Sequence, residues 1–121
     1  MTSAYTSIGA SSADSLLQQA MQLHQQGQLD AAAQVYAQVA EGDPQRADAL
    51  HLHGVLCAQR RDFDQAHALI WQALTLNPSE AMFHNNLANV CVERQQFADA
   101  EALYVRAIEL DGGRLDALSN L

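Results

Sequence analysis

Residues 47–80 read ADALHLHGVLCAQRRDFDQAHALIWQALTLNPSE, and residues 81–114 read AMFHNNLANVCVERQQFADAEALYVRAIELDGGR. The two stretches match place by place at a spacing of 34 residues. The matched pairs include Phe63 and Phe97, Ala66 and Ala100, Ala73 and Ala107, and Cys57 and Cys91. Self-similarity at a fixed period of this length predicts an array of stacked structural repeats.

The same spacing divides the whole chain into units. Three units cover residues 13–46, 47–80 and 81–114, and a fourth begins at 115 and stops at 121. Residues 1–12 are rich in Ser, Thr and Ala without any periodicity, so we expect a disordered lead-in there. A repeat stack needs a cap on its last apolar face. We therefore expect the chain to be a fragment of a longer protein, or to pair end to end with a second copy.

Each unit is predicted to hold two antiparallel helices. In the second unit, Leu50, Gly54 and Cys57 share one face at helical spacing. A second apolar stripe begins at Ala66, and Asn77-Pro78 ends it because proline cannot donate the next helical hydrogen bond. Small residues at matched places, such as Gly54 and Ala66, would let the two helices approach closely. The sequence thus predicts an all-α solenoid of three helical hairpins.

Composition and charge exclude several classes of function. The net charge is −8, and the six basic residues are scattered arginines, so no basic stripe could follow a nucleic acid backbone. No apolar run is long enough to span a membrane, and the N-terminus has no secretory signal pattern. We expect a cytoplasmic protein without nucleic acid or membrane partners. The Ala-rich, Lys-free composition favours a bacterial origin.

The pattern resembles the tetratricopeptide repeat family, through the period, the small residues, the aromatic at Phe63 and Phe97, and the closing Pro44 and Pro78. The third unit departs from the pattern, because Gly112-Gly113 replaces its closing proline. The resemblance implies a right-handed superhelix whose first helices line a concave groove for peptides. The basic residues of the family's carboxylate clamp are missing from the matching places, which disfavours binding of chaperone C-termini.

The resemblance assigns certain positions of each unit to the groove. The residues at these positions are mostly apolar in the first unit and rich in asparagine in the third. We expect Leu17, Met21 and Val55 to take apolar side chains, with His51 beside them. The stretch 85–89 reads NNLAN, and 118–121 reads LSNL. This wording is similar to the superhelix of O-GlcNAc transferases, in which an asparagine ladder holds the peptide main chain. The resemblance implies that Asn86 and Asn120 are rungs, with Asn85 and Asn89 on the same stretch. The alternative is that these amides are solvated residues of the helix face.

The other reactive residues of the sequence do not form a pattern typical of catalysis or metal binding. His51 and His53 are two residues apart, so on a helix they diverge and make a poor metal pair. We interpret Cys57 and Cys91 as small buried apolar residues. Asp64 is expected to cap a helix, and Trp71 with Tyr36 to pack within the stack. We therefore predict no catalytic residue, metal or cofactor.

Three functions stay open at this point. The first is a protein-interaction module whose groove binds a peptide or partner protein. The second is the substrate-docking part of a larger protein glycosyltransferase whose catalysis lies in another domain. The third is a scaffold that associates with itself through its C-terminal repeat.

Overall fold

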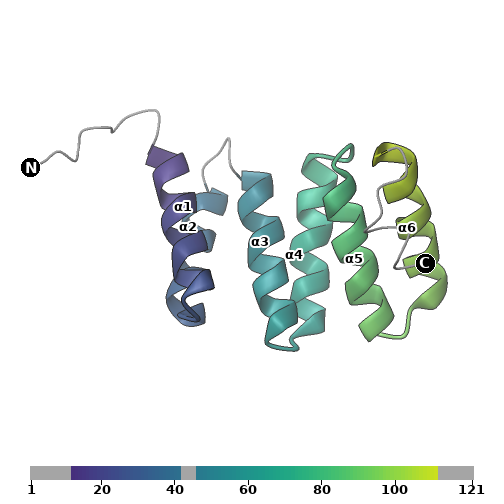
Figure 1. Cartoon of the computed structure of the whole chain (residues 1–121), viewed down its shortest axis with the longest axis horizontal. Coiled ribbons are helices and arrows are strands. Elements are labelled where there is room, and N and C mark those ends of the chain that lie inside the picture. The colour runs from purple at the N-terminus through teal and green to yellow at the C-terminus, as the bar shows by residue number, and fades with distance from the viewer. Residues whose placement is uncertain (1–11, 42–45, 112–121) are drawn as a thin grey trace, which may run out of the picture.

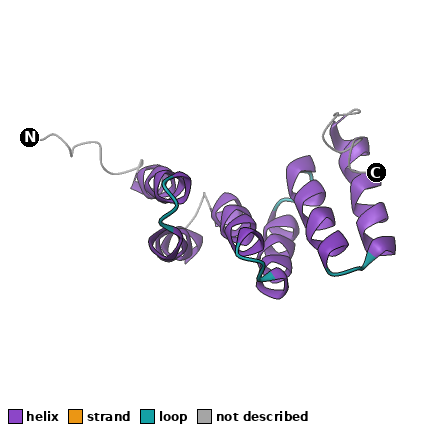
Figure 2. Cartoon of the chain, turned by 60° about the horizontal axis from the view of Figure 1, so that its bottom comes forward, coloured by secondary structure: helices purple, strands orange, loops and turns teal. Residues whose placement is uncertain are grey.

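The computed structural model describes residues 12–41 and 46–111, and all the regular structure there is helical. Figure 1 shows the hairpins following one another in chain order along the long axis, and Figure 2 shows short loops joining the two helices of each hairpin. The six helices are α1 (Ser12–Gln25), α2 (Leu29–Glu41), α3 (Arg46–Gln59), α4 (Phe63–Leu76), α5 (Ala81–Glu93) and α6 (Phe97–Asp111). None of them is long and apolar enough to cross a membrane.

The helices associate as three hairpins, α1 with α2, α3 with α4 and α5 with α6. Successive hairpins stack through α2 against α3 and α4 against α5, and α3 also contacts α5 directly. This arrangement confirms the predicted all-α stack of three hairpins. Because most contacts join neighbours in the chain, each hairpin depends on the next for the cover of its apolar face.

Small residues allow the close approach inside each hairpin. A Cβ atom on Gly54 would lie 2.5 Å from Ile70 Cγ1 and 3.2 Å from the carbonyl oxygen of Ala66. Ala66 itself is fully buried, as is Ala32 at the matching place of the first hairpin. The predicted role of the small residues is confirmed: a larger side chain at these places would push the two helices apart.

The turn inside each hairpin has one left-handed residue at the same place of the repeat. These residues are Gly27, Arg61 and Gln95, with φ of 81°, 66° and 63°. The amide that follows each of them reaches back to a carbonyl of the first helix; for example, Gln96 N donates to Cys91 O at 2.8 Å. This is a Schellman-type helix end, for which glycine is the preferred residue. Two of the three hairpins therefore make the turn with a side chain that tolerates this conformation poorly.

Some local predictions need correction. The cap of α4 is Asp62, whose carboxylate accepts from Gln65 N at 3.3 Å, and Asp64 lies in the first helical turn instead. An acid there still interacts favourably with the helix dipole. Helix α1 begins at Ser12, one residue inside the expected lead-in. Residues 1–11 and the predicted fourth unit at 115–121 lie outside the described residues.

Candidate peptide-binding groove

The first helices of the hairpins, α1, α3 and α5, form three neighbouring hollows. The first hollow, of about 320 Å³, lies between the middle of α1 and the first turns of α3 and α5, and includes Met21, Asp48, Leu52 and Glu80. The second, of about 390 Å³, lies between the ends of α1 and α3. The third, of about 300 Å³, lies between α3 and α5 and includes Val55, Gln59, Asn86 and Asn89.

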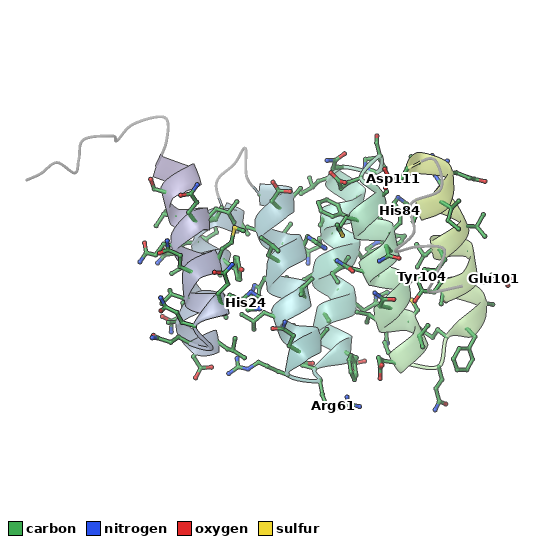
Figure 3. The ribbon with its side chains drawn as sticks, in the orientation of Figure 1. His24, Arg61, His84, Glu101, Tyr104 and Asp111 are labelled. Atoms are coloured by element: carbon green, nitrogen blue, oxygen red, sulfur yellow. The ribbon has the colours of Figure 1, made fainter. Side chains whose placement is uncertain are left out.

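Shared residues join the hollows into one surface, which we call the groove. Met21 and Leu52 line both the first and second hollows, and Gln59 lines the second and third. His24 lies at the end of α1 in the second hollow (Figure 3). Its Nε2 donates to Gln59 Oε1 at 2.7 Å, and its Nδ1 accepts from the hydroxyl of Tyr36 at 2.9 Å. This chain of hydrogen bonds ties α1, α2 and α3 together across the groove.

The predicted apolar residues differ in how much surface they offer. Met21 is 38% exposed, while Leu17 is 9% exposed and belongs mainly to the core around Tyr36. Both line the first hollow, and half-buried Val55 lines the third. The structure thus places all three against the groove, with Leu17 as part of its floor.

His51 is buried in the wall of the first hollow. Its ring packs on Phe83 with centroids 4.6 Å apart, and its Nε2 accepts a hydrogen bond from Asn86 Nδ2 at 2.8 Å. Burial lowers the pKa of His51 from 6.5 to about 4. The imidazole is therefore neutral near pH 7, and it acts as an acceptor that holds the Asn86 amide in one orientation.

Asn86 and Asn89 each use half of their amide inside the protein. Asn86 donates its Nδ2 to His51, and Asn89 accepts at its Oδ1 from the hydroxyl of Tyr104 on α6. Both side chains are half-buried and line the third hollow. Among the residues that the structure describes, no hydrogen bond is made by Asn86 Oδ1, an acceptor, or by Asn89 Nδ2, a donor. These amides are consequently more constrained than solvated residues of a helix face would be.

The other two asparagines of the prediction are not placed in the groove. Asn85 is only 8% exposed, and it is absent from the residues that line the three hollows. The helical spacing explains this, because a residue next to Asn86 points about 100° away from it around the helix. Asn120 lies outside the described residues.

Acidic groups dominate the charge of the groove. Asp48 and Glu80 line the first hollow and are exposed. In the third hollow, Glu93 lies 3.9 Å from Arg61, which also sits over the ring of Phe63 at 5.1 Å. Three other arginines pair with acids outside the three hollows: Arg60 with Asp30, Arg94 with Asp64, and Arg106 with Glu109.

A further hollow, which we call the outer hollow, corrects the prediction for Trp71. This side chain is 53% exposed and lines a space of about 440 Å³ with His67 and Ala68 of α4 and with Asp99 and Leu103 of α6. Tyr36, in contrast, is fully buried as predicted. The sequence does contain a sign of the difference, because Trp71 falls off the apolar stripe of its helix.

The remaining reactive side chains are separated or buried. His51 faces Phe83, whereas His53 stacks on Tyr36 with ring centroids 6.2 Å apart, so the two histidines diverge as predicted. Within residues 12–41 and 46–111, no group of three or more His, Cys, Asp or Glu is arranged to hold a metal. The two cysteines are free and buried, and burial raises the pKa of both thiols.

Comparisons with known proteins agree with this architecture. A family model described as tetratricopeptide repeat matches residues 17–66 and 51–114. No curated protein sequence matches the chain. Among solved structures, the first TPR of Spaghetti (RPAP3), bound to the HSP90 peptide SRMEEVD, is 20% identical with a TM-score of 0.86, over 94% of this chain and 90% of that one.

Two further solved structures are informative. An O-GlcNAc transferase mutant from Thermobaculum terrenum is 30% identical with a TM-score of 0.85, over 100% of this chain but only 22% of that one. PcrH, in complex with the chaperone binding region of PopB, is 16% identical with a TM-score of 0.83, over 93% of this chain and 94% of that one. The likenesses at 16% and 20% identity support the fold alone.

Proposed function

Because the chain belongs to the tetratricopeptide repeat family, we propose that it is a protein-interaction module that binds an extended peptide segment in the groove. The continuity of the three hollows supports this proposal, since one segment could run along all of them. Two proteins of the same fold, Spaghetti with an HSP90 peptide and PcrH with a region of PopB, provide an analogy for such binding.

The observation that carries the proposal is the orientation of the two amides on α5. His51 and Tyr104 hold Asn86 and Asn89 so that one offers an acceptor and the other a donor. The two residues are three apart and therefore neighbours on one helix face. An extended peptide presents N–H donors and C=O acceptors along its edge. The pair could bind such a main chain without reading its sequence.

The first test removes these two amides. In the double variant Asn86→Ala, Asn89→Ala, we expect peptide affinity to fall by roughly fivefold to hundredfold, since two hydrogen bonds are lost at about 0.5–1.5 kcal/mol each. Peptides for the assay come from a random display library selected on the unaltered protein, and affinity is read by fluorescence anisotropy. The matched control is Gln34→Ala with Gln38→Ala, which removes two exposed amides from α2.

A second variant separates orientation from presence. Tyr104→Phe removes the hydroxyl that holds Asn89 and leaves both amides in place, so a smaller loss of affinity is expected. Circular dichroism must show an intact fold for every variant. Unchanged affinity in the folded double alanine variant would contradict the proposed role of the ladder.

The second candidate is the docking part of a protein glycosyltransferase. The 30% identity to the Thermobaculum terrenum O-GlcNAc transferase across the whole chain favours it, although the chain spans only 22% of that protein. Sequencing the parent gene beyond codon 121 tests the idea. A reading frame that runs into further repeats and a transferase domain would support it, and a stop codon after Leu121 would contradict it.

Self-association is the third candidate. Phe97 at the start of α6 is 62% exposed, whereas its counterpart Phe63 is half-buried. Light scattering over a range of protein concentrations tests this alternative. A mass that stays at that of one chain at the highest concentration would argue against it.

A further inference from the structure

The first hollow combines an apolar base with two carboxylates that form no ion pair with any other described residue. Its base is formed by Leu17, Leu52, Met82 and Phe83 from α1, α3 and α5, together with the half-exposed Met21. Asp48 and Glu80 stand at the same hollow from α3 and from the start of α5. We propose that this hollow selects peptide segments in which an apolar side chain is flanked by lysine or arginine, an inference that rests on the proposed function.

The apolar base of the first hollow is small and tightly packed. Leu17 and Phe83 are 9% and 2% exposed, so the floor of the hollow is already packed and shaped. The volume of about 320 Å³ is at the lower end of known ligand sites, roughly 300–1,000 Å³. A single large aliphatic or aromatic side chain of a peptide would bury the exposed part of Met21 and gain the usual stabilisation from removing apolar surface from water.

The charges of Asp48 and Glu80 are not neutralised by other described residues. Neither forms an ion pair within the described part of the chain, and the side chain of Glu80 makes no capping hydrogen bond to α5. Asp48 lies in the first turn of α3, where it offsets the helix dipole. That dipole end corresponds to about half a positive charge, so each full carboxylate leaves a net negative potential.

No arginine within residues 12–41 and 46–111 lines this hollow. Arg46 begins α3 but is not among the residues that line the hollow, and Arg61 lies at the third hollow beside Glu93. Arg60 and Arg94 are each paired with an aspartate outside the groove. A peptide with a basic residue next to its apolar anchor would supply the missing charge, whereas an acidic peptide would be repelled.

The experiment is a selection from a random peptide library displayed on phage, with the intact chain as bait. We expect the recovered peptides to be enriched in Lys or Arg beside Leu, Met or Phe, relative to the unselected library. Recovered peptides that lack basic enrichment, or are enriched in Asp and Glu, would overturn the inference while leaving the proposed function standing. Recovery of no peptide above background would overturn both.

A charge-removal variant tests the assignment to these two residues. For a selected basic peptide, Asp48→Asn with Glu80→Gln should weaken binding by about threefold to tenfold at low salt, as expected for exposed ion pairs. The control Glu41→Gln with Glu101→Gln removes the same net charge from exposed places on α2 and α6, and Glu101 points away from the stack (Figure 3). Equal losses in the two variants would mean that only overall charge attracts the peptide, which would refute the site.

Discussion

Acidification should destabilise this protein through His51. The imidazole is 7% exposed, and burial lowers its pKa from 6.5 to about 4. As pH falls, the unfolded chain therefore binds a proton first. The contribution of the neutral His51 ring to the free energy of unfolding is complete above pH 6.5 and is lost progressively between pH 6.5 and about 4. Protonation of the native state would also set an N–H of His51 against the N–H of Asn86, which now donates to it.

The magnitude follows from the pKa difference. A separation between 6.5 and about 4 corresponds to about 3 kcal/mol, at about 1.36 kcal/mol per pH unit. This is a large share of a typical domain stability of about 5–15 kcal/mol. Asp48 and Glu80 line the same hollow and would partly attract the protonated ring. The value of about 3 kcal/mol is therefore the largest loss of unfolding free energy expected from protonation of His51.

The assay is urea unfolding at pH 7 and pH 4, followed by far-ultraviolet circular dichroism. The variant His51→Gln keeps an acceptor for Asn86 but cannot titrate, so it should lose about 3 kcal/mol less than the unaltered chain between the two pH values. The matched control His53→Gln changes a half-buried histidine that stacks on Tyr36, and we expect a smaller effect. Equal pH sensitivity of the unaltered chain and His51→Gln would refute the reasoning.

Three further predictions concern the scaffold. Gly54→Ala should cost about 1–3 kcal/mol in thermal unfolding, because the new Cβ would lie 2.5 Å from Ile70 Cγ1; wild-type stability would contradict the close packing of the hairpin. Gln95→Gly should stabilise by about 0.5–1 kcal/mol, since glycine accepts the φ of 63° without strain; a loss of stability in urea would speak against that account. The two buried cysteines should react with a thiol reagent only when the fold opens, because the reagent cannot reach them in the folded chain, and the raised pKa of both thiols slows the reaction further. Rapid labelling of the folded chain would show that they are accessible.

The repeat allowed the fold to be predicted from the sequence in detail. The spacing of 34 residues identifies which residues share a structural place, and the small residues at two of those places mark where paired helices cross. A Cβ atom on Gly54 would lie only 3.2 Å from the carbonyl oxygen of Ala66, as this close approach requires. Local patterns suffice here because the helices of a hairpin are close in sequence, and their packing repeats.

The site was harder to predict because it depends on contacts between repeats. The sequence indicated Asn86 and Asn89, but their orientation is set by His51 and Tyr104, which are 35 and 15 residues away from them. No helical periodicity contains that information. The burial of Asn85 and the exposure of Trp71 depend in the same way on how neighbouring hairpins cover each helix.

Trp71 is an intrinsic fluorescent probe of the outer hollow that does not report on the groove. It is the sole tryptophan of the sequence, and the outer hollow that it lines has no residue in common with the groove. Its emission therefore reports the access of water between α4 and α6. A peptide that occupies the groove of the folded protein should leave the emission spectrum unchanged, and a spectral shift on adding peptide would reveal binding at the other side of the stack.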